Sequence, residues 1–314
     1  MAILKPHPFL AFWQLVRWPN LLMMALSLNL IRFALFVPLQ IPMVLSHWHF
    51  QLLVLSTVLI GMAGYVVNDL YDIQNDLINK PHKVLIGKVF SHRFAWNAFY
   101  ICFLSGAILG YYLGQHTGKW MYGLINLITG FWLYLYAADF KGRPVLGNVI
   151  ISFLSAGVLT YPIFFDVLPR LPLPETDAGL QVAQVLLVYF LFAFGLSWAR
   201  EMVKDLEDRE GDNRVGLKTL PIVWGETYTR WLALALSVVL MAALAFIGFY
   251  LWPQDLLSAL YVVLGILLPL ILATFKLALA STNKQYHQVA TWHKISMLGA
   301  ILSIPIFTLS ALYL

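Results

Sequence analysis

Apolar runs about twenty residues long recur along the whole chain, and they restrict it to one kind of fold. Hydrophobic residues make up 61% of the 314 residues and charged residues only 11%, with a mean hydropathy of +0.77. A soluble domain carries about 25% charged residues. Because lipid offers the peptide groups no hydrogen bonds, such runs cross a membrane as helices. The predicted fold class is all-α: a polytopic protein of the inner or plasma membrane.

The apolar runs predict nine spanning helices within a single domain, residues 1–314. The connecting loops then alternate between two membrane faces, and of the twenty lysines and arginines only Arg32, Lys119 and Arg170 fall on one of these faces. Because positively charged loops remain in the cytoplasm, we expect a cytoplasmic N-terminus and a C-terminus on the opposite side. The expected helices cover approximately residues 10–38, 50–76, 92–114, 119–137, 147–168, 179–204, 224–250, 256–281 and 290–313.

Several classes of protein are excluded by the remaining composition. The single cysteine, Cys102, lies in an apolar run, which excludes an internal disulfide and argues against a thiolate metal site. Membrane topology accounts for the net charge of +5, so we expect no nucleic-acid partner, and nothing in the sequence indicates an obligate protein partner. No P-loop or GxGxxG sequence precedes a predicted helix, so nucleotide binding is not indicated.

A cluster of carboxylates stands at the end of the second predicted helix. Asn68, Asp72 and Asp76 are spaced i, i+4, i+8, and Asp69 precedes Asp72 by three residues. Side chains at these intervals share one helix face, where like charges repel one another unless a cation binds. Three lysines follow in the sequence, Lys80, Lys83 and Lys88. Carboxylates beside ammonium groups suggest a site that binds a divalent metal and a polyanion together, at the cytoplasmic face.

A second cluster follows the sixth predicted helix with the same spacing. Asp205, Asp208 and Asp212 repeat the i, i+3, i+7 intervals of the first three aspartates. A duplicated four-helix unit, covering about residues 10–137 and 147–281 with the ninth helix added, would place the two clusters opposite each other. We therefore expect a central cavity capped by two Asp-rich cytoplasmic loops. Gly211 is a position at which the sixth helix can end, which would place Asp212 on a turn.

Other polar residues indicate what this site binds. The carboxylates and the Asn68 amide offer oxygen ligands, which suit Mg²⁺ and its contacts with phosphates. Arg17 and Asn20 bring a charge and an amide into the first apolar run, where polar groups usually face a cavity. Tyr136 and Lys141, between the fourth and fifth helices, are candidates for a phosphate contact.

The two clusters resemble the paired signatures of the UbiA superfamily of intramembrane prenyltransferases. The first reads Asn68-Asp69-x-x-Asp72-x-x-x-Asp76. The second reads Lys204-Asp205-x-x-Asp208-x-x-Gly211-Asp212 and is closest in form to the branch that acts on geranylgeranylglyceryl phosphate. The resemblance implies a nine-helix bundle around a cavity and Mg²⁺-dependent transfer of a prenyl group, geranylgeranyl in that branch, from its diphosphate to a lipid-pathway acceptor.

The resemblance also implies roles for individual residues. The aspartates are expected to act in catalysis: Asp69, Asp72, Asp76, Asp205, Asp208 and Asp212. Two Mg²⁺ ions are expected to bind Asn68, Asp72, Asp76, Asp205, Asp208 and Asp212. The diphosphate is expected to contact Arg17, Asn20, Lys83, Tyr136, Lys141, Arg200 and Lys204. Many members carry an arginine-rich run where this chain has lysines, which lack the bidentate fork of arginine.

Several alternatives stay open. The acceptor can be aromatic, as in quinone or tocopherol pathways, and Asp69 and Asp208 are both candidates for a general base. The rings of Tyr65 and Trp198 are candidates to stabilise a carbocation. A membrane transporter is a more distant alternative, but it predicts charges near mid-membrane on several helices rather than at one face.

Overall fold

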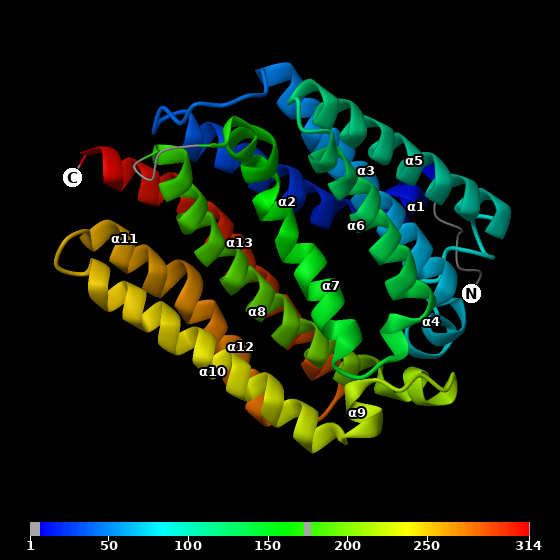
Figure 1. Ribbon diagram of the computed structural model, residues 1–314. Coiled ribbons are helices and arrows are strands. Elements are labelled where there is room, and N and C mark those ends of the chain that lie inside the picture. The colour runs from blue at the N-terminus through cyan, green and yellow to red at the C-terminus, as the bar shows by residue number, and fades with distance from the viewer. Residues whose placement is uncertain (1–6, 173–176, 314) are drawn as a thin grey trace.

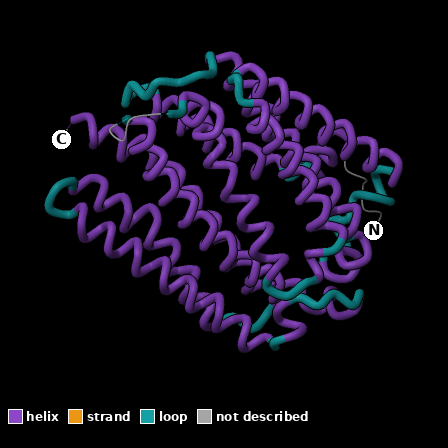
Figure 2. Tube along the Cα trace, viewed as in Figure 1, coloured by secondary structure: helices purple, strands orange, loops and turns teal. Residues whose placement is uncertain are grey.

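The computed structural model describes residues 7–172 and 177–313, so Lys5, one of the charges used to orient the chain, lies outside these residues. Figures 1 and 2 show that the described residues form long helices joined by short loops, with no strand. The helices stand side by side as one bundle, with the last helix next to the long helix that precedes residue 215. The all-α fold class is confirmed.

The bundle is built from helices that are mostly α-helical and partly π- or 3₁₀-helical. The segments up to residue 138 are α1 (Pro8–Leu15), α2 (Trp18–Asn29), η1 (Leu30–Phe36), α3 (His47–Tyr71), α4 (Ile73–Asn79), α5 (His92–His116) and α6 (Trp120–Ala138). The middle of the chain forms η2 (Phe140–Gly142), α7 (Leu146–Gly157), η3 (Val158–Thr160), η4 (Ile163–Val167), η5 (Leu168–Arg170) and α8 (Ala178–Arg214). The remainder forms α9 (Leu220–Val223), α10 (Glu226–Leu251), α11 (Leu256–Tyr261), η6 (Val262–Leu267), α12 (Leu268–Leu279) and α13 (Asn283–Tyr313).

Eight segments among the described residues are suited to crossing a membrane, or nine when one bent pair of helices counts as a span. Eight are helices of sufficient length and hydropathy, and Leu146–Thr160 with Ile163–Arg170 form one further span that bends by 42°. Counted with this pair, the number of spans agrees with the prediction. The four-helix internal repeat stays a prediction.

The first predicted helix is divided in two by the backbone at Arg17. This residue has a φ of +52°, in the left-handed region that a continuing helix does not use. The helix restarts at Trp18 with Pro19 in its first turn, where proline is tolerated because no partner exists there for a backbone N–H. The break separates α1 from the membrane span and leaves Arg17 at the junction.

The carboxylate clusters lie on helices, and not on the Asp-rich loops that the sequence predicts. α3 ends at Asp72, and α4 begins with the next residue. α8 does not stop near residue 204 but continues through Gly211 to Arg214. The reason is packing: the backbone N–H of Gly211 donates to Asn79 Oδ1 at 2.9 Å, so α4 supports this part of α8.

Small residues bring the membrane helices close together around α5. Gly106, Gly110 and Gly114 recur at every fourth position along one face. A Cβ on Gly114 would lie 2.5 Å from the backbone nitrogen of Gly123 in α6, so only glycine permits this approach. Such close backbone contact is a common basis of helix association in lipid, where burial of apolar surface contributes little.

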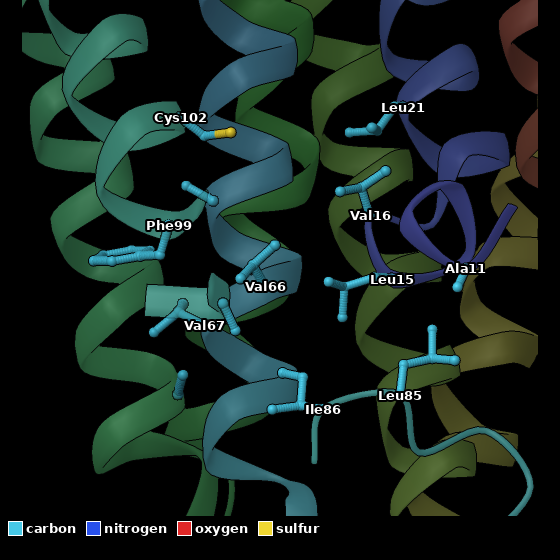
Figure 3. Close-up of a cluster of buried hydrophobic side chains, with 13 residues drawn as sticks. Ala11, Leu15, Val16, Leu21, Val66, Val67, Leu85, Ile86, Phe99 and Cys102 are labelled. Atoms are coloured by element: carbon cyan, nitrogen blue, oxygen red, sulfur yellow. The ribbon is translucent and has the colours of Figure 1, made fainter. Parts of the chain in front are cut away.

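An apolar cluster holds α1 and the lysine-containing loop against the bundle (Figure 3). Leu15 of α1 lies with Val66 of α3, and Leu85 and Ile86 of the loop belong to the same buried group. Leu15 and Val66 are at most 1% exposed. This packing positions the loop that carries Lys80 and Lys83 beside the end of α3.

A buried ion pair joins η1 to η4. Arg32 Nη1 lies 2.6 Å from Asp166 Oδ2, and their side chains are 2% and 0% exposed. Arg32 Nη2 also donates to the carbonyl of Leu45 at 2.6 Å, and the Leu45 N–H donates to Asp166 at 2.8 Å. The guanidinium stands 4.6 Å from the centre of the Phe50 ring. Arg32 is therefore part of the core, although the sequence analysis counted it among the charges at one membrane face.

Replacement of Asp166 by asparagine is expected to destabilise the fold by about 3–5 kcal/mol, because it leaves the buried guanidinium without its counter-charge. Unfolding of the purified protein in detergent measures the change. Glu210→Gln is the matched control, since it breaks a pair with Arg214 whose side chains are both 61% exposed. That change is expected to cost less than about 1 kcal/mol. Equal losses in the two variants would contradict a structural role for the buried pair.

Candidate active site

A cavity of about 1080 Å³ occupies the bundle between α2, α3, α6, α7, α8 and α13. Its inner walls are apolar and include Met23, Ile31, Leu186 and Ile304. Its other end is polar. The residues predicted to act in catalysis, to bind metal or to bind the diphosphate all line it: Arg17, Asn20, Asn68, Asp69, Asp72, Asp76, Lys83, Tyr136, Lys141, Arg200, Lys204, Asp205, Asp208 and Asp212.

Asp72 stands at the break between α3 and α4 and has two partners in the first cluster's surroundings. Its carboxylate accepts a hydrogen bond from Asn68 Nδ2 at 2.6 Å and pairs with Lys141 Nζ. Burial alone lowers the pKa of the Lys141 ammonium, but the Asp72 carboxylate outweighs it and raises the pKa above its usual value. Lys141 therefore carries its positive charge into the cavity at any physiological pH.

The second cluster contacts residues that neighbour the first cluster in the sequence. Asn75 Nδ2 donates to Asp212 Oδ1 at 2.7 Å, and Lys80 Nζ lies 2.6 Å from Asp208 Oδ1. Asp205 accepts from Asn148 Nδ2 of α7 at 2.9 Å. These contacts join α8 to α4, to Lys80 directly after α4, and to α7. The predicted opposition of the two clusters across one cavity is therefore what the geometry shows.

Gly211 sets the distance between these two helices. A Cβ at this position would lie 2.2 Å from Asn75 Oδ1 and 2.3 Å from Asn79 Nδ2. Both atoms end asparagine side chains that hold α4 to α8, Asn75 through Asp212 and Asn79 through the Gly211 N–H, so a Cβ here would displace these hydrogen bonds. The glycine in the second motif therefore permits α4 and α8 to approach until their polar side chains meet.

The remaining two aspartates of the first cluster differ in their surroundings. Arg17 Nη2 lies 2.7 Å from Asp69 Oδ1. Asp76 has no side-chain hydrogen bond to any described residue, and burial, with the charges of Asp72 and Asp69, raises its pKa to about 6. A carboxylate that is repelled in this way favours binding of a cation.

The donor atoms at this end of the cavity fit Mg²⁺. They are carboxylate and amide oxygens, the ligand type that this ion prefers, and it commonly retains several waters. In the described part of the chain no three His, Cys, Asp or Glu side chains converge closely enough to enclose an ion by themselves. The arrangement thus suits an ion that shares its coordination with water and with a phosphate.

Several lining residues were not predicted. Asn75 lines the cavity and follows Asp72 at i+3, so the helical spacing of the first motif already contained a signal for it. Glu201 precedes Asp205 by four residues and so shares a helix face with the second motif, whereas Lys294 had no such signal. Of the two aromatic candidates, Tyr65 lines the cavity, whereas Trp198 lies outside the lining and packs 5.8 Å from the Phe194 ring. The structure therefore brings Tyr65, and not Trp198, to the cavity.

Both the sequence and the fold have known relatives. Residues 16–298 match the UbiA prenyltransferase family. The chain belongs to this family. It is 27% identical over 276 residues to a digeranylgeranylglyceryl phosphate synthase of Methanosphaera stadtmanae, covering 85% of this chain and 92% of the relative. It is 31% identical over 231 residues to the synthase of that name from Methanothermobacter thermautotrophicus, covering 73% of this chain and 74% of the relative.

Solved UbiA structures share the fold of this prenyltransferase. A solved digeranylgeranylglyceryl phosphate synthase superposes with a TM-score of 0.63 at 22% identity, covering 96% of this chain and 98% of that chain. A UbiA homolog from Archaeoglobus fulgidus, bound to GPP and Mg²⁺, superposes with a TM-score of 0.59 at 16% identity, covering 94% and 99%. The chain is thus an integral membrane prenyltransferase with the UbiA fold.

Proposed function

We propose that the enzyme transfers a geranylgeranyl group from its diphosphate to geranylgeranylglyceryl phosphate and releases diphosphate. The observation that carries this proposal is the cavity, in which two opposed carboxylate clusters stand at one end of an apolar chamber. The polar end suits a diphosphate and the apolar walls suit an isoprenoid tail, which gains about 0.8 kcal/mol for each buried CH₂ group. The names of the relatives above support this choice of acceptor.

In the proposed reaction the allylic C–O bond breaks, and its electron pair leaves with the diphosphate. The acceptor hydroxyl forms a new C–O ether bond at that carbon, and its proton passes to a base in the cavity, for which Asp69 and Asp208 are candidates. Lys141 and Lys83 hold positive charge near the departing diphosphate, and Tyr136 offers it a hydroxyl donor.

Two bound Mg²⁺ ions would supply further neutralisation of the leaving diphosphate. The residues proposed to hold them are those predicted from the motifs: Asn68, Asp72 and Asp76 for one ion, and Asp205, Asp208 and Asp212 for the other. The contacts between α4 and α8 keep the two sets facing each other.

We further propose that this end of the bundle faces the cytoplasm, with the N-terminus on the same side and the C-terminus opposite. The distribution of lysine and arginine between the loops supports this orientation. It would give the polar end of the cavity direct access to water-borne ions.

Purified enzyme in detergent, given geranylgeranyl diphosphate and Mg²⁺, is expected to convert geranylgeranylglyceryl phosphate to a diether phosphate detectable by mass spectrometry. Chelation of Mg²⁺ with EDTA is expected to abolish the product. Parallel reactions contain aromatic acceptors such as hydroxybenzoate and homogentisate. Turnover of an aromatic acceptor without turnover of the glycerophosphate would overturn the proposed substrate. Ion flux in proteoliposomes without turnover of any prenyl diphosphate would overturn the proposed reaction.

A further inference from the structure

Lys294 is a cation of the cavity that neither motif contains. It lies on α13 and is partly buried, and its Nζ donates to Asn20 Oδ1 of α2 at 2.9 Å. Within the described part of the chain no carboxylate oxygen comes within 4.0 Å of this ammonium group. The ammonium group of Lys294 therefore hydrogen-bonds to a neutral amide, whereas those of Lys80 and Lys141 pair with carboxylates.

The neighbours of Lys294 add to the positive charge. Arg200 and Lys204 of α8 line the same part of the cavity, and both pair with one carboxylate, Glu201, at 2.9 Å. The Nε atom of Arg200 is buried and has no hydrogen-bond partner among the described residues. Arg200 and Lys204 share the Glu201 carboxylate and Lys294 has no carboxylate partner among the described residues, so this group of side chains carries an excess of positive charge and a buried donor without a partner.

This excess distinguishes the region from the carboxylate clusters. In those clusters Asp72 neutralises the charge of Lys141, and Asp208 and Glu207 neutralise that of Lys80. An anion therefore needs an additional cation in order to bind there. Beside Lys294 the protein itself provides the positive charge. An anion that binds here needs no metal.

The cavity wall next to these cations is apolar. One helical turn beyond Lys294 on α13 lies Met297, and one turn beyond Asn20 on α2 lies Met23; both line the cavity. A charged head beside an apolar wall is the arrangement that an anionic lipid requires, because its headgroup and its tail need different surroundings at the same time. A free phosphate ion would leave the apolar part of this surface uncovered.

We propose that Asn20, Arg200, Lys204 and Lys294 form a subsite for the phosphate monoester of the acceptor lipid. This inference rests on the proposed function, and it deepens that function by assigning the acceptor headgroup to a place separate from the diphosphate. A phosphate monoester carries a charge of about −1.5 to −2 at neutral pH, opposite in sign to the excess charge of these side chains. Asn20, Arg200 and Lys204, which the sequence assigned to the diphosphate, contact the acceptor instead.

The test measures binding without turnover. In EDTA, wild-type enzyme is expected to bind geranylgeranylglyceryl phosphate at least about tenfold more tightly than the corresponding alcohol, since charge-assisted hydrogen bonds to the phosphate are lost with the alcohol. Lys294→Met, which keeps the length of the side chain, is expected to remove most of this preference. Lys294→Arg is expected to retain it. Lys284→Met is the matched control, because Lys284 lies on the same helix, is exposed, and is absent from the cavity lining.

Kinetics separate the subsite from the diphosphate site. With Mg²⁺ present, Lys294→Met is expected to raise the KM for the acceptor about tenfold or more and to leave the KM for geranylgeranyl diphosphate within about twofold. A rise in the donor KM alone, or an unchanged phosphate preference in EDTA, would overturn the subsite. Equally tight binding of inorganic phosphate would overturn the lipid as its occupant. Absence of turnover by wild-type enzyme with intact phosphate preference would instead contradict the proposed function and leave the subsite supported.

Discussion

Replacement of Asp76 with asparagine is expected to lower turnover by roughly a thousandfold, the loss typical of removing a key electrostatic group from an active site. In the proposed mechanism this carboxylate binds one of the two Mg²⁺ ions, and an amide is a much weaker ligand for a hard cation. Asp76 makes no side-chain hydrogen bond to a described residue and lines the cavity. The substitution therefore breaks no contact that supports the fold.

The same substitution is expected to stabilise the metal-free protein at neutral pH. Burial and the charges of Asp72 and Asp69 raise the pKa of Asp76 from 3.8 to about 6. The folded protein thus binds this proton more tightly than the unfolded chain, and the resulting stability is lost as the pH rises from about 4 through about 6. Above that range the charged carboxylate costs up to about 3 kcal/mol, at about 1.4 kcal/mol for each pKa unit. Asparagine never carries that charge.

Unfolding of wild type and variant in EDTA, measured from pH 4 to pH 7.5, shows which of the two proteins has the larger free energy of unfolding at each pH. The variant is expected to be the more stable protein at pH 7, and the difference is expected to vanish near pH 4. Asp139→Asn is the control, since Asp139 is 54% exposed, pairs with Arg143 and does not line the cavity. Normal turnover of Asp76→Asn would contradict its role as a ligand. Lower stability at pH 7 would contradict the electrostatic account of its pKa.

The helices and both carboxylate clusters are predictable because each depends on residues close together in the sequence. An apolar run of sufficient length specifies a spanning helix regardless of what it packs against. The intervals between Asp69, Asp72 and Asp76 specify a shared face as long as the backbone stays nearly helical. This condition holds even though the chain breaks at Asp72, because α4 starts at the next residue.

The features that were not predictable depend on residues far apart in the sequence. Gly211 normally suggests a helix end, and it continues the helix here because Asn79, 132 residues earlier, supports it. The ion pair of Arg32 with Asp166 spans 134 residues, and the contact of Lys294 with Asn20 spans 274. None of these pairs has a local pattern, since each forms only when distant helices pack together.

Asp72→Asn and Asp205→Asn are each expected to lower turnover by roughly a thousandfold, and the double variant is expected to lose little more than either single variant. The two residues belong to opposite clusters that, in the proposed mechanism, act on one diphosphate. Groups that act as one unit show strongly non-additive effects, because loss of either already prevents the shared step. Independent contributions would instead multiply to about a millionfold.

Asparagine keeps a hydrogen-bond acceptor in both variants, although at position 72 it removes the counter-charge of Lys141. Its side-chain oxygen can still accept from Asn68 at position 72 and from Asn148 at position 205, as the carboxylates do at 2.6 and 2.9 Å. Single-turnover measurements of product ether, with protein unfolding followed in parallel, separate a catalytic loss from a structural one. Full activity in either single variant would refute the opposed-cluster mechanism. A multiplicative loss in the double variant would show that the clusters serve separate steps, because only a shared diphosphate couples them.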